Sequence, residues 1–281
     1  MFHTSQFASR RSSQRWPGLT AACLVAVFLA IGASQPAGRT PALPEESVVA
    51  TTPQKAIAST DSDVLGIWIK AARESHQIVR DYRCTFVKRE RIEGVLQEEQ
   101  TAQMQVRVQP FSVHMKFIAP KSAAGREAVY VAGRHNNKLR AKGGGALSLV
   151  GFVSMDPHDA RAMQCTRHTI TEAGIGNMLA RIVQAHDLPR PANSPTRVTV
   201  GEVSIGQHAC IRFDVIDPTA DGARNTYRSV IYFDKATNLP MRYEAYDRPR
   251  TGGDPDGELL ECYSYLDCHF NLNLSDAAFN Y

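Results

Sequence analysis

The chain has 281 residues, of which 43% are hydrophobic and 21% are charged, and its formal net charge is +4 at neutral pH. This composition excludes a collagen-like chain, a coiled coil and a wholly disordered protein. The positive excess comes from residues 1–33, which hold Arg10, Arg11 and Arg15 and no acidic residue. Without these three arginines the chain holds 29 basic and 28 acidic residues, so we do not expect it to bind nucleic acid.

Residues 1–33 have the three parts of a secretory signal peptide. A cationic start ends at Arg15, an apolar run covers 19–33, and the small residues Gly32, Ala33 and Ser34 end it. The run is about 15 residues long, whereas roughly 20 apolar residues span a bilayer as a helix. We expect cleavage near residue 33 and export to the periplasm or cell envelope. An uncleaved N-terminal membrane anchor is the alternative.

Residues 34–60 are rich in Pro, Ala, Ser and Thr and contain no aromatic residue. Such a segment cannot bury enough apolar surface to offset the entropy that ordering it would cost. We therefore predict a flexible linker over 34–60 and one folded domain over 61–281. About 221 residues are enough to build a single large core.

The spacing of apolar residues predicts two helices and many strands in the folded part. A helical period starts near Asp61 or Ser62 and continues to about residue 80. A second helical stripe over 171–187 holds Ile175, Met178, Leu179, Ile182 and His186. Elsewhere the period is two, and Gly, Pro and Asn turns separate the expected strands. These strands are 82–92, 97–108, 111–119, 127–133, 138–142, 147–153, 196–204, 207–216, 227–234, 240–247 and 259–272.

Strands that follow one another by short turns, without a helix between each pair, predict antiparallel pairing. We expect a mainly β (α+β) domain with a single, strongly curved antiparallel sheet. This sheet is a half-barrel of about eleven strands with two main helices on its concave face. Alternation along the last strand is expected to place six side chains on one face, namely Leu260, Cys262, Leu266, Cys268, Phe270 and Leu272.

The cysteines after the expected signal peptide give no metal or redox motif. They are Cys84, Cys165, Cys210, Cys262 and Cys268, and no two of them form a Cys-x-x-Cys pair. We expect mostly buried thiols, because free cysteine behaves as a small apolar residue. A bridge from Cys84 to Cys262 or to Cys268 is the alternative in an oxidising compartment.

No other motif indicates catalysis, a metal or a cofactor. Asp156, His158 and Asp159 form the one tight group of carboxylates and histidine, which we interpret as a polar turn. The glycines at 143–145 lack the Lys-Ser/Thr pair of a nucleotide-binding loop. Alternating charges predict cross-strand ion pairs rather than a headgroup-binding patch, in the stretches Lys88-Arg89-Glu90-Arg91, Arg126-Glu127 and Arg242 with Glu244.

Four stretches carry a resemblance to a known family. They are DYRCTFVKRER (81–91), Phe111 to Val131 with Pro120 and Gly125-Arg126-Glu127, Ile170 to Arg181, and NLPMRYEAYD (238–247). Over about 80–281 the chain resembles the family called domain of unknown function 1571, exported proteins typical of planctomycete-type bacteria. More distantly it is similar to periplasmic lipoprotein carriers of the LolA and LppX kind. The second resemblance implies a half-barrel whose concave face, lidded by helices, holds acyl chains.

These observations favour a non-catalytic envelope protein that binds an apolar ligand, either a lipid or the acyl chain of a lipoprotein. A sensory or regulatory module that binds a lipid, a peptide or a membrane protein is the first alternative, and a hydrolase with a dispersed site is the second. The apolar side chains that alternate with polar neighbours are the predicted lining of the cavity. They are Met104, Val106, Val113, Met115, Phe117, Leu266 and Phe270, with Leu260 beside them.

Overall fold

The computed structural model describes residues 62–189, 195–220 and 226–281. The expected signal peptide at 1–33 and the expected linker at 34–60 lie outside the described residues. Among the helices that the structure describes, none combines the length and the apolar character needed to cross a membrane.

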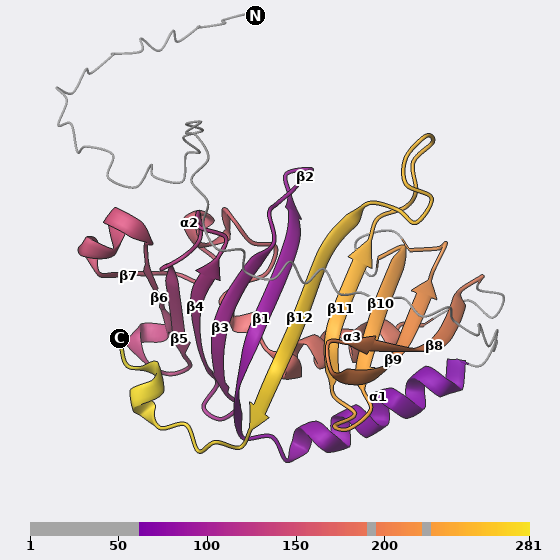
Figure 1. Ribbon diagram of the computed structural model, residues 1–281, viewed down its shortest axis with the longest axis horizontal. Coiled ribbons are helices and arrows are strands. Elements are labelled where there is room, and N and C mark those ends of the chain that lie inside the picture. The colour runs from indigo at the N-terminus through magenta and orange to yellow at the C-terminus, as the bar shows by residue number, and fades with distance from the viewer. Residues whose placement is uncertain (1–61, 190–194, 221–225) are drawn as a thin grey trace, which may run out of the picture. The chain divides into compact units, whose positions relative to one another are not determined.

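One antiparallel sheet of twelve strands dominates the structure (Figure 1). Its order is β7-β6-β5-β4-β3-β1-β12-β11-β10-β9-β8, and the short β2 pairs with β1. The strands are β1 (Asp81–Ile92), β2 (Val95–Leu96), β3 (Gln100–Arg107), β4 (Ser112–Ala119), β5 (Glu127–Val131), β6 (Leu139–Lys142), β7 (Phe152–Met155), β8 (Arg197–Ile205), β9 (His208–Ile216), β10 (Arg228–Asp234), β11 (Pro240–Tyr246) and β12 (Leu259–Phe270).

The first and last strands meet in the middle of this sheet. β1 and β12 have 12 residues each and pair from Tyr82 opposite Phe270 to Glu90 opposite Glu261. On one side of this pair the strands β3 to β7 follow in chain order, away from β1. On the other side β11 to β8 follow in reverse chain order, away from β12. The sheet therefore consists of two consecutive halves, β3–β7 and β8–β11, joined through β1 and β12.

Two main helices, α1 (Ser62–Gln77) and α3 (Ile175–His186), pack on one face of the sheet. The buried side of α3 consists of Ile175, Met178, Leu179 and Ile182, as the helical stripe predicts. Short helical turns complete the domain, namely η1 (His135–Asn137), η2 (Gly145–Val150), α2 (Ala160–Met163), η3 (Ile170–Glu172) and η4 (Asp276–Phe279).

Two tyrosines from the sheet fix the start of α3. The hydroxyl oxygen of Tyr82 accepts a hydrogen bond from the backbone N–H of Ile175 at 2.7 Å, and that of Tyr265 accepts one from Gly174 at 3.0 Å. These contacts satisfy donors that the first turn of a helix leaves without intrahelical partners. Gly174 has a φ of 100°, and a Cβ there would lie 2.9 Å from the Tyr82 hydroxyl. Only glycine fits this close approach.

A β-bulge in the last strand changes which side chains share a face. The register of β1 against β12 shifts between Arg83 and Thr85, and Asp267 on β12 has a φ of 51°. An extra residue of this kind reverses the alternation beyond it. As a result Cys268 and Phe270 pack with the helix-facing core, while Leu266 packs on the opposite face. The prediction that Leu266, Cys268 and Phe270 share one face of the sheet is therefore wrong.

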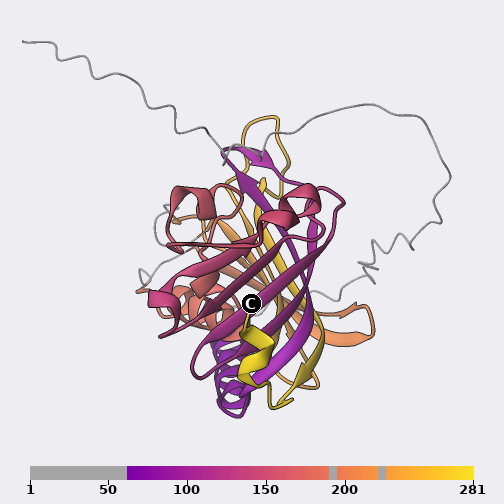
Figure 2. The same ribbon diagram turned by 90° about the vertical axis from the view of Figure 1, so that its left-hand side faces the viewer.

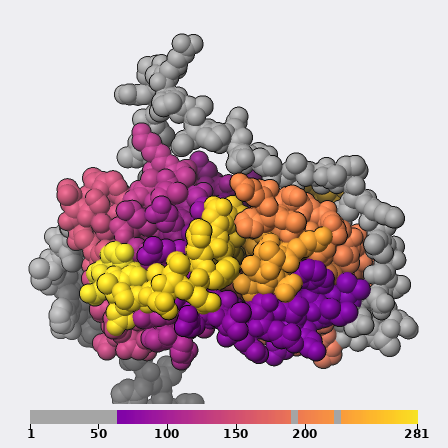
Figure 3. Space-filling model, turned by 60° about the horizontal axis from the view of Figure 1, so that its bottom comes forward, coloured from indigo at the N-terminus to yellow at the C-terminus, as the bar shows by residue number. Residues whose placement is uncertain are grey.

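Both faces of the sheet carry buried apolar clusters. Opposite the helices, Tyr232 and Met241 pack in one cluster, and Leu274 and Phe279 cover Val129 in another. The C-terminal segment that carries these last contacts is yellow on the surface in Figure 3.

The structure confirms a mainly β domain with one antiparallel sheet and two main helices on one face. The sheet is open, because its edge strands β7 and β8 do not pair with each other, and it is not strongly curled. Since apolar clusters cover both faces, the sheet does not have to wrap around a single core. This finding revises the expected half-barrel.

Candidate functional site

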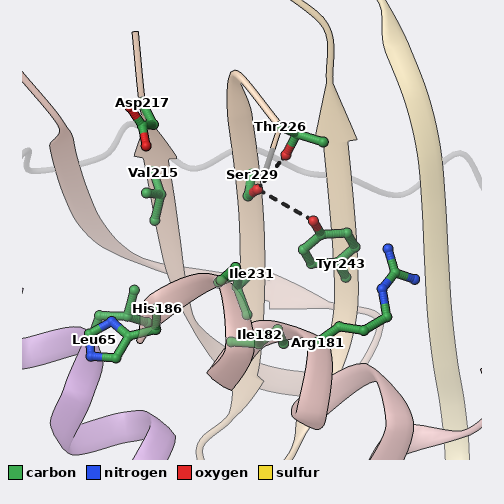
Figure 4. Close-up of a pocket in the computed structure, with 11 residues that line it drawn as sticks. Leu65, Arg181, Ile182, His186, Val215, Asp217, Thr226, Ser229, Ile231 and Tyr243 are labelled. Carbon is green, nitrogen blue, oxygen red and sulfur yellow. Dashed lines mark hydrogen bonds between the residues drawn. The ribbon is translucent and has the colours of Figure 1, made fainter. Parts of the chain in front are cut away.

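A pocket lies between α3 and the strands β9, β10 and β11 (Figure 4). Its volume is about 50 Å³, enough for about four water molecules at the usual ~10–15 Å³ each. The lining consists of Leu65 from α1, Arg181, Ile182, Ala185 and His186 from α3, and Val215, Asp217, Thr226, Ser229, Ile231 and Tyr243 from β9–β11 and the adjoining turns.

The pocket has an apolar side and a polar side. Ile182 and Ile231 approach each other from the helix and the sheet, with Val215 beyond them (Figure 4). On the polar side, the hydroxyl groups of Thr226 and Ser229 lie 2.8 Å apart, and Ser229 lies 3.4 Å from the Tyr243 hydroxyl. Burial is the main cause that raises the pKa of Tyr243, so this phenol stays protonated and can donate. A pocket of this kind suits a mainly apolar ligand with one polar end.

Arg181 connects the pocket to a buried group of charges. Its Nη2 donates to Glu261 Oε1 at 2.6 Å, and its guanidinium carbon lies 5.7 Å from the centre of the Tyr243 ring. Among the described residues, Glu261 is the acceptor of the Arg181 side chain. The guanidinium group has five N–H donors, so it keeps several for a ligand in the pocket.

Glu90 and Glu261 face each other across the central strands, and each is only 3% exposed. Like charges in direct cross-strand positions repel, so both need partners. Glu261 Oε2 accepts hydrogen bonds from Arg167 Nε at 3.0 Å and from His168 Nε2 at 2.7 Å. On the other carboxylate, Glu90 Oε2 pairs with Lys88 Nζ at 2.9 Å and Oε1 accepts from the Tyr263 hydroxyl at 2.5 Å.

The ionisation of this cluster follows from those contacts. Burial alone would raise the pKa of Glu261, but the hydrogen bonds and positive charges of His168 and Arg181 outweigh it and lower the pKa to about 2. Burial and the two carboxylates raise the pKa of Tyr263 far above its usual range. The cluster therefore holds an ionised Glu261 and a protonated Tyr263 over the whole neutral range.

The acidic and histidine side chains are also candidates for metal ligation. Over 62–189, 195–220 and 226–281, no group of three or more His, Cys, Asp or Glu side chains is arranged to hold a metal ion. In the predicted polar turn, Asp156 accepts a hydrogen bond from the backbone N–H of His158 at 2.8 Å. Asp159 accepts one from Arg161 at the start of α2, at 2.9 Å. Both carboxylates are occupied by these local contacts.

The predicted cavity residues lie outside this pocket. Met104, Val106, Val113 and Met115 are buried in the helix-facing core, with Phe117 and Phe270 packed against it. Leu266 lies on the opposite face because of the bulge. Leu260 is half-buried in β12. The binding role of these residues stays a prediction, and they no longer form one surface.

The predicted ion pairs form partly as expected. Lys88–Glu90 and Arg242–Glu244 pair within one strand, at 2.9 and 2.6 Å, rather than across strands. Glu127 pairs across strands as predicted, with Lys142 at 3.4 Å and with His114 at 3.2 Å.

All five described cysteines are free thiols in the structure. Cys84, Cys210 and Cys262 are buried, Cys268 is half-buried and Cys165 is exposed.

Sequence reasoning identified only part of the pocket. Ile182 and His186 belong to the predicted helical stripe, and Arg181 lies in one of the family-like stretches. The opposing residues Val215, Ser229 and Ile231 gave no signal, because alternation within a strand does not reveal which helix will cover it.

Several solved structures are similar in fold. The Mycobacterium tuberculosis lipoprotein LppX is 10% identical, with 75% of this chain and 98% of that chain covered and a TM-score of 0.44. A LolA superfamily protein from Nitrosomonas europaea is 11% identical, with coverages of 77% and 97% and a TM-score of 0.32. The MucA/MucB complex of Pseudomonas aeruginosa contains a chain that is 15% identical, with coverages of 76% and 60% and a TM-score of 0.41.

Among curated proteins, no significant match to this chain is found. The family model described as "Protein of unknown function (DUF1571)" matches residues 79–281, which agrees with the resemblance expected over about 80–281. The match covers well over half of the chain, and the chain belongs to the DUF1571 family.

Proposed function

We propose that this protein is a non-catalytic envelope protein that binds the apolar part of a lipid or of a lipid-modified protein between α3 and the sheet. The pocket at β9–β11 carries this proposal, because it joins an apolar side at Ile182 and Ile231 to hydroxyl and guanidinium donors. An amphipathic ligand needs both, an apolar surface for its chain and fixed donors for its polar end.

The volume of the pocket adds a mechanical requirement. About 50 Å³ holds a few solvent molecules but not an acyl chain of many methylene groups. Uptake of such a chain therefore requires α3 to move away from β9–β11. The contacts that must survive or re-form are the tyrosine bonds at the start of α3 and the Arg181–Glu261 pair. We expect α3 to pivot near its start, where the hydroxyl groups of Tyr82 and Tyr265 hold it.

Export is part of the same proposal. The cationic start, the short apolar run and the small residues of 1–33 support secretion to the envelope. There the ligand would be either a free lipid or the acyl chain of a partner lipoprotein.

Filling the pocket tests the proposal. Ala185 lines the pocket, whereas Ala180 lies on the exposed side of the same helix. An Ala185→Trp variant should lose uptake of a fluorescent fatty-acid analogue, and Ala180→Trp should bind it as the wild type does. Circular dichroism confirms that both variants keep the fold. Equal binding by the two variants would contradict the proposed location.

A second variant tests the wider lining predicted from the sequence. Phe117→Asp places a charge at the edge of the helix-facing core, far along the sheet from β9–β11. Loss of uptake in a folded Phe117→Asp protein would extend the ligand site toward β4. Wild-type protein that is folded and binds no apolar probe would overturn the carrier function and favour a module that binds a protein partner.

A further inference from the structure

The positive charge of the folded part is concentrated in one half of the sheet. Residues 100–155, which form β3 to β7, hold eight lysines and arginines and a single acidic residue, Glu127. The chain after residue 33 is nearly neutral as a whole, so this half carries a strong local excess. Figure 2 looks at the molecule from the β7 side of the sheet.

Three of these eight basic residues pair with carboxylates, Arg107 and Arg134 with Asp276 and Lys142 with Glu127. Glu127 is shared by Lys142 and His114. Lys116, Lys121 and Lys138 are exposed, and the ion pairs of the described chain include none of them. The lysines are thus available to an external anion.

Exposed aliphatic side chains lie at the edge of the same half. Leu149 is 90% exposed and Val150 is 68% exposed in η2, and Val153 in the edge strand β7 is 45% exposed. Adjacent exposed aliphatic residues on a folded domain indicate an interaction surface.

The glycines before η2 bring this tip close to the basic turn between β4 and β5. A Cβ on Gly144 would lie 2.4 Å from the carbonyl oxygen of Ala124, so only bare backbone allows the approach. That turn carries Lys121, and the following strand begins after Arg126. The aliphatic tip therefore has positive charge beside it.

We propose that the tip at Leu149 and Val150, together with Lys116 and Lys121 at the same end of the sheet, docks on an anionic lipid surface. Lysine side chains are attracted to anionic headgroups, and aliphatic side chains enter the boundary between headgroups and acyl chains. A nucleic acid would use the positive charge but offers no apolar layer for Leu149 and Val150. This docking does not depend on what occupies the pocket at β9–β11.

Tryptophan reporters in the chain from residue 34 onward test the docking. Leu149→Trp places a reporter at the tip, and Ile78→Trp places a control reporter at another strongly exposed site after α1, where the residue is 73% exposed. Both variants keep the native Trp68, so their difference reports the new positions. With vesicles of phosphatidylglycerol and brominated phosphatidylcholine, we expect stronger quenching in L149W than in I78W. Equal quenching would overturn the proposal.

The role of the charge is tested in the L149W background. Lys116→Gln with Lys121→Gln should weaken vesicle affinity by roughly fivefold per lysine. Vesicles of phosphatidylcholine alone should quench the reporter far less than anionic ones. Unchanged affinity in the double variant, equal quenching by neutral vesicles, or preferential protection of the reporter by duplex DNA would each overturn docking on an anionic lipid surface.

Discussion

The two halves of the sheet differ in their balance of charge. Residues 100–155 of β3–β7 hold eight basic residues and one acidic residue, whereas residues 197–246 of β8–β11 hold six of each. In β8–β11 the charges form short pairs. Asp214 binds both Arg212 and Arg228 at 2.7 Å, and Arg242 binds Glu244 at 2.6 Å.

This difference teaches that one continuous sheet can carry two separate interaction surfaces. Unpaired like charges repel one another and cost stability. The excess of basic residues in β3–β7 therefore leaves a positive potential that can attract an external anionic partner. In β8–β11 the charged side chains pair with one another, and this half has the pocket with an apolar side. The central strands β1 and β12 separate the two surfaces and hold the buried Glu90 and Glu261 between them.

Breaking the central charge cluster should give the largest effect on stability. Glu261→Gln leaves Arg167, His168 and Arg181 without their shared carboxylate, and loss of one buried ionic partner costs about 3–5 kcal/mol. Urea unfolding measures the change. Glu202→Gln, an exposed site in β8, is the matched control and should stay within about 0.5 kcal/mol of the wild type. A loss below about 1 kcal/mol in Glu261→Gln would show that the cluster is not a network.

Acid should weaken the same cluster. The pKa of Glu261 is lowered from 4.5 to about 2, so the folded state binds this proton less readily than the unfolded state. Its contribution is complete above pH 4.5 and is lost as the pH falls toward 2. The shift corresponds to about 3 kcal/mol. Unfolding measured from pH 6 to pH 2.5 should show this loss in the wild type and not in Glu261→Gln; parallel curves would contradict it.

Thiol reactivity tests whether the interior beside β9 stays inaccessible to solvent. Burial, assisted by the charge of Asp234, raises the pKa of Cys210 from 9.0 to about 11, which leaves about a hundredfold less thiolate at neutral pH. Cys165 is exposed. Timed alkylation followed by peptide mass spectrometry should modify Cys165 well before Cys210 and Cys262. Modification of Cys210 at a similar rate would show that β9 and its neighbours open readily.

The smallest effect on stability is expected in the basic half. Lys121→Glu changes an exposed residue without a carboxylate partner in the described chain, so the free energy of unfolding should change by no more than about 0.5 kcal/mol. Affinity for anionic vesicles should fall at the same time. A large change in stability would show that this lysine serves the fold rather than an external surface.

Local patterns predicted the secondary structure of this protein better than its site. Alternation identified the strands except the one expected over 147–153, where the helical turn η2 (Gly145–Val150) precedes β7 (Phe152–Met155). The stripe from Ile175 to Ile182 identified the buried side of α3. The pattern failed at Asp267, where a single extra residue moved Leu266 away from Phe270. A bulge leaves no mark on alternation until the partner strand is known.

The charged and apolar parts of the site depend on long-range pairing. Glu90 and Glu261 are 171 positions apart in the sequence and become neighbours only because β1 pairs with β12. Ile231 meets Ile182 only because α3 covers β10. Neither contact follows from periodicity, whereas the family-like stretches already contained Glu90 and Arg181. The resemblance to a known family thus included Glu90 and Arg181, but the periodicity of the sequence could not predict which residues they contact.

Native mass spectrometry of the protein purified without detergent from its own host tests the central claim most directly. If an apolar ligand binds between α3 and β9–β11, wild-type protein should carry an adduct that organic solvent extracts. The Ala185→Trp variant should lack this adduct, and Ala180→Trp should retain it. A bare polypeptide mass for the wild type, together with no uptake of a fatty-acid analogue by the folded protein, would contradict the claim.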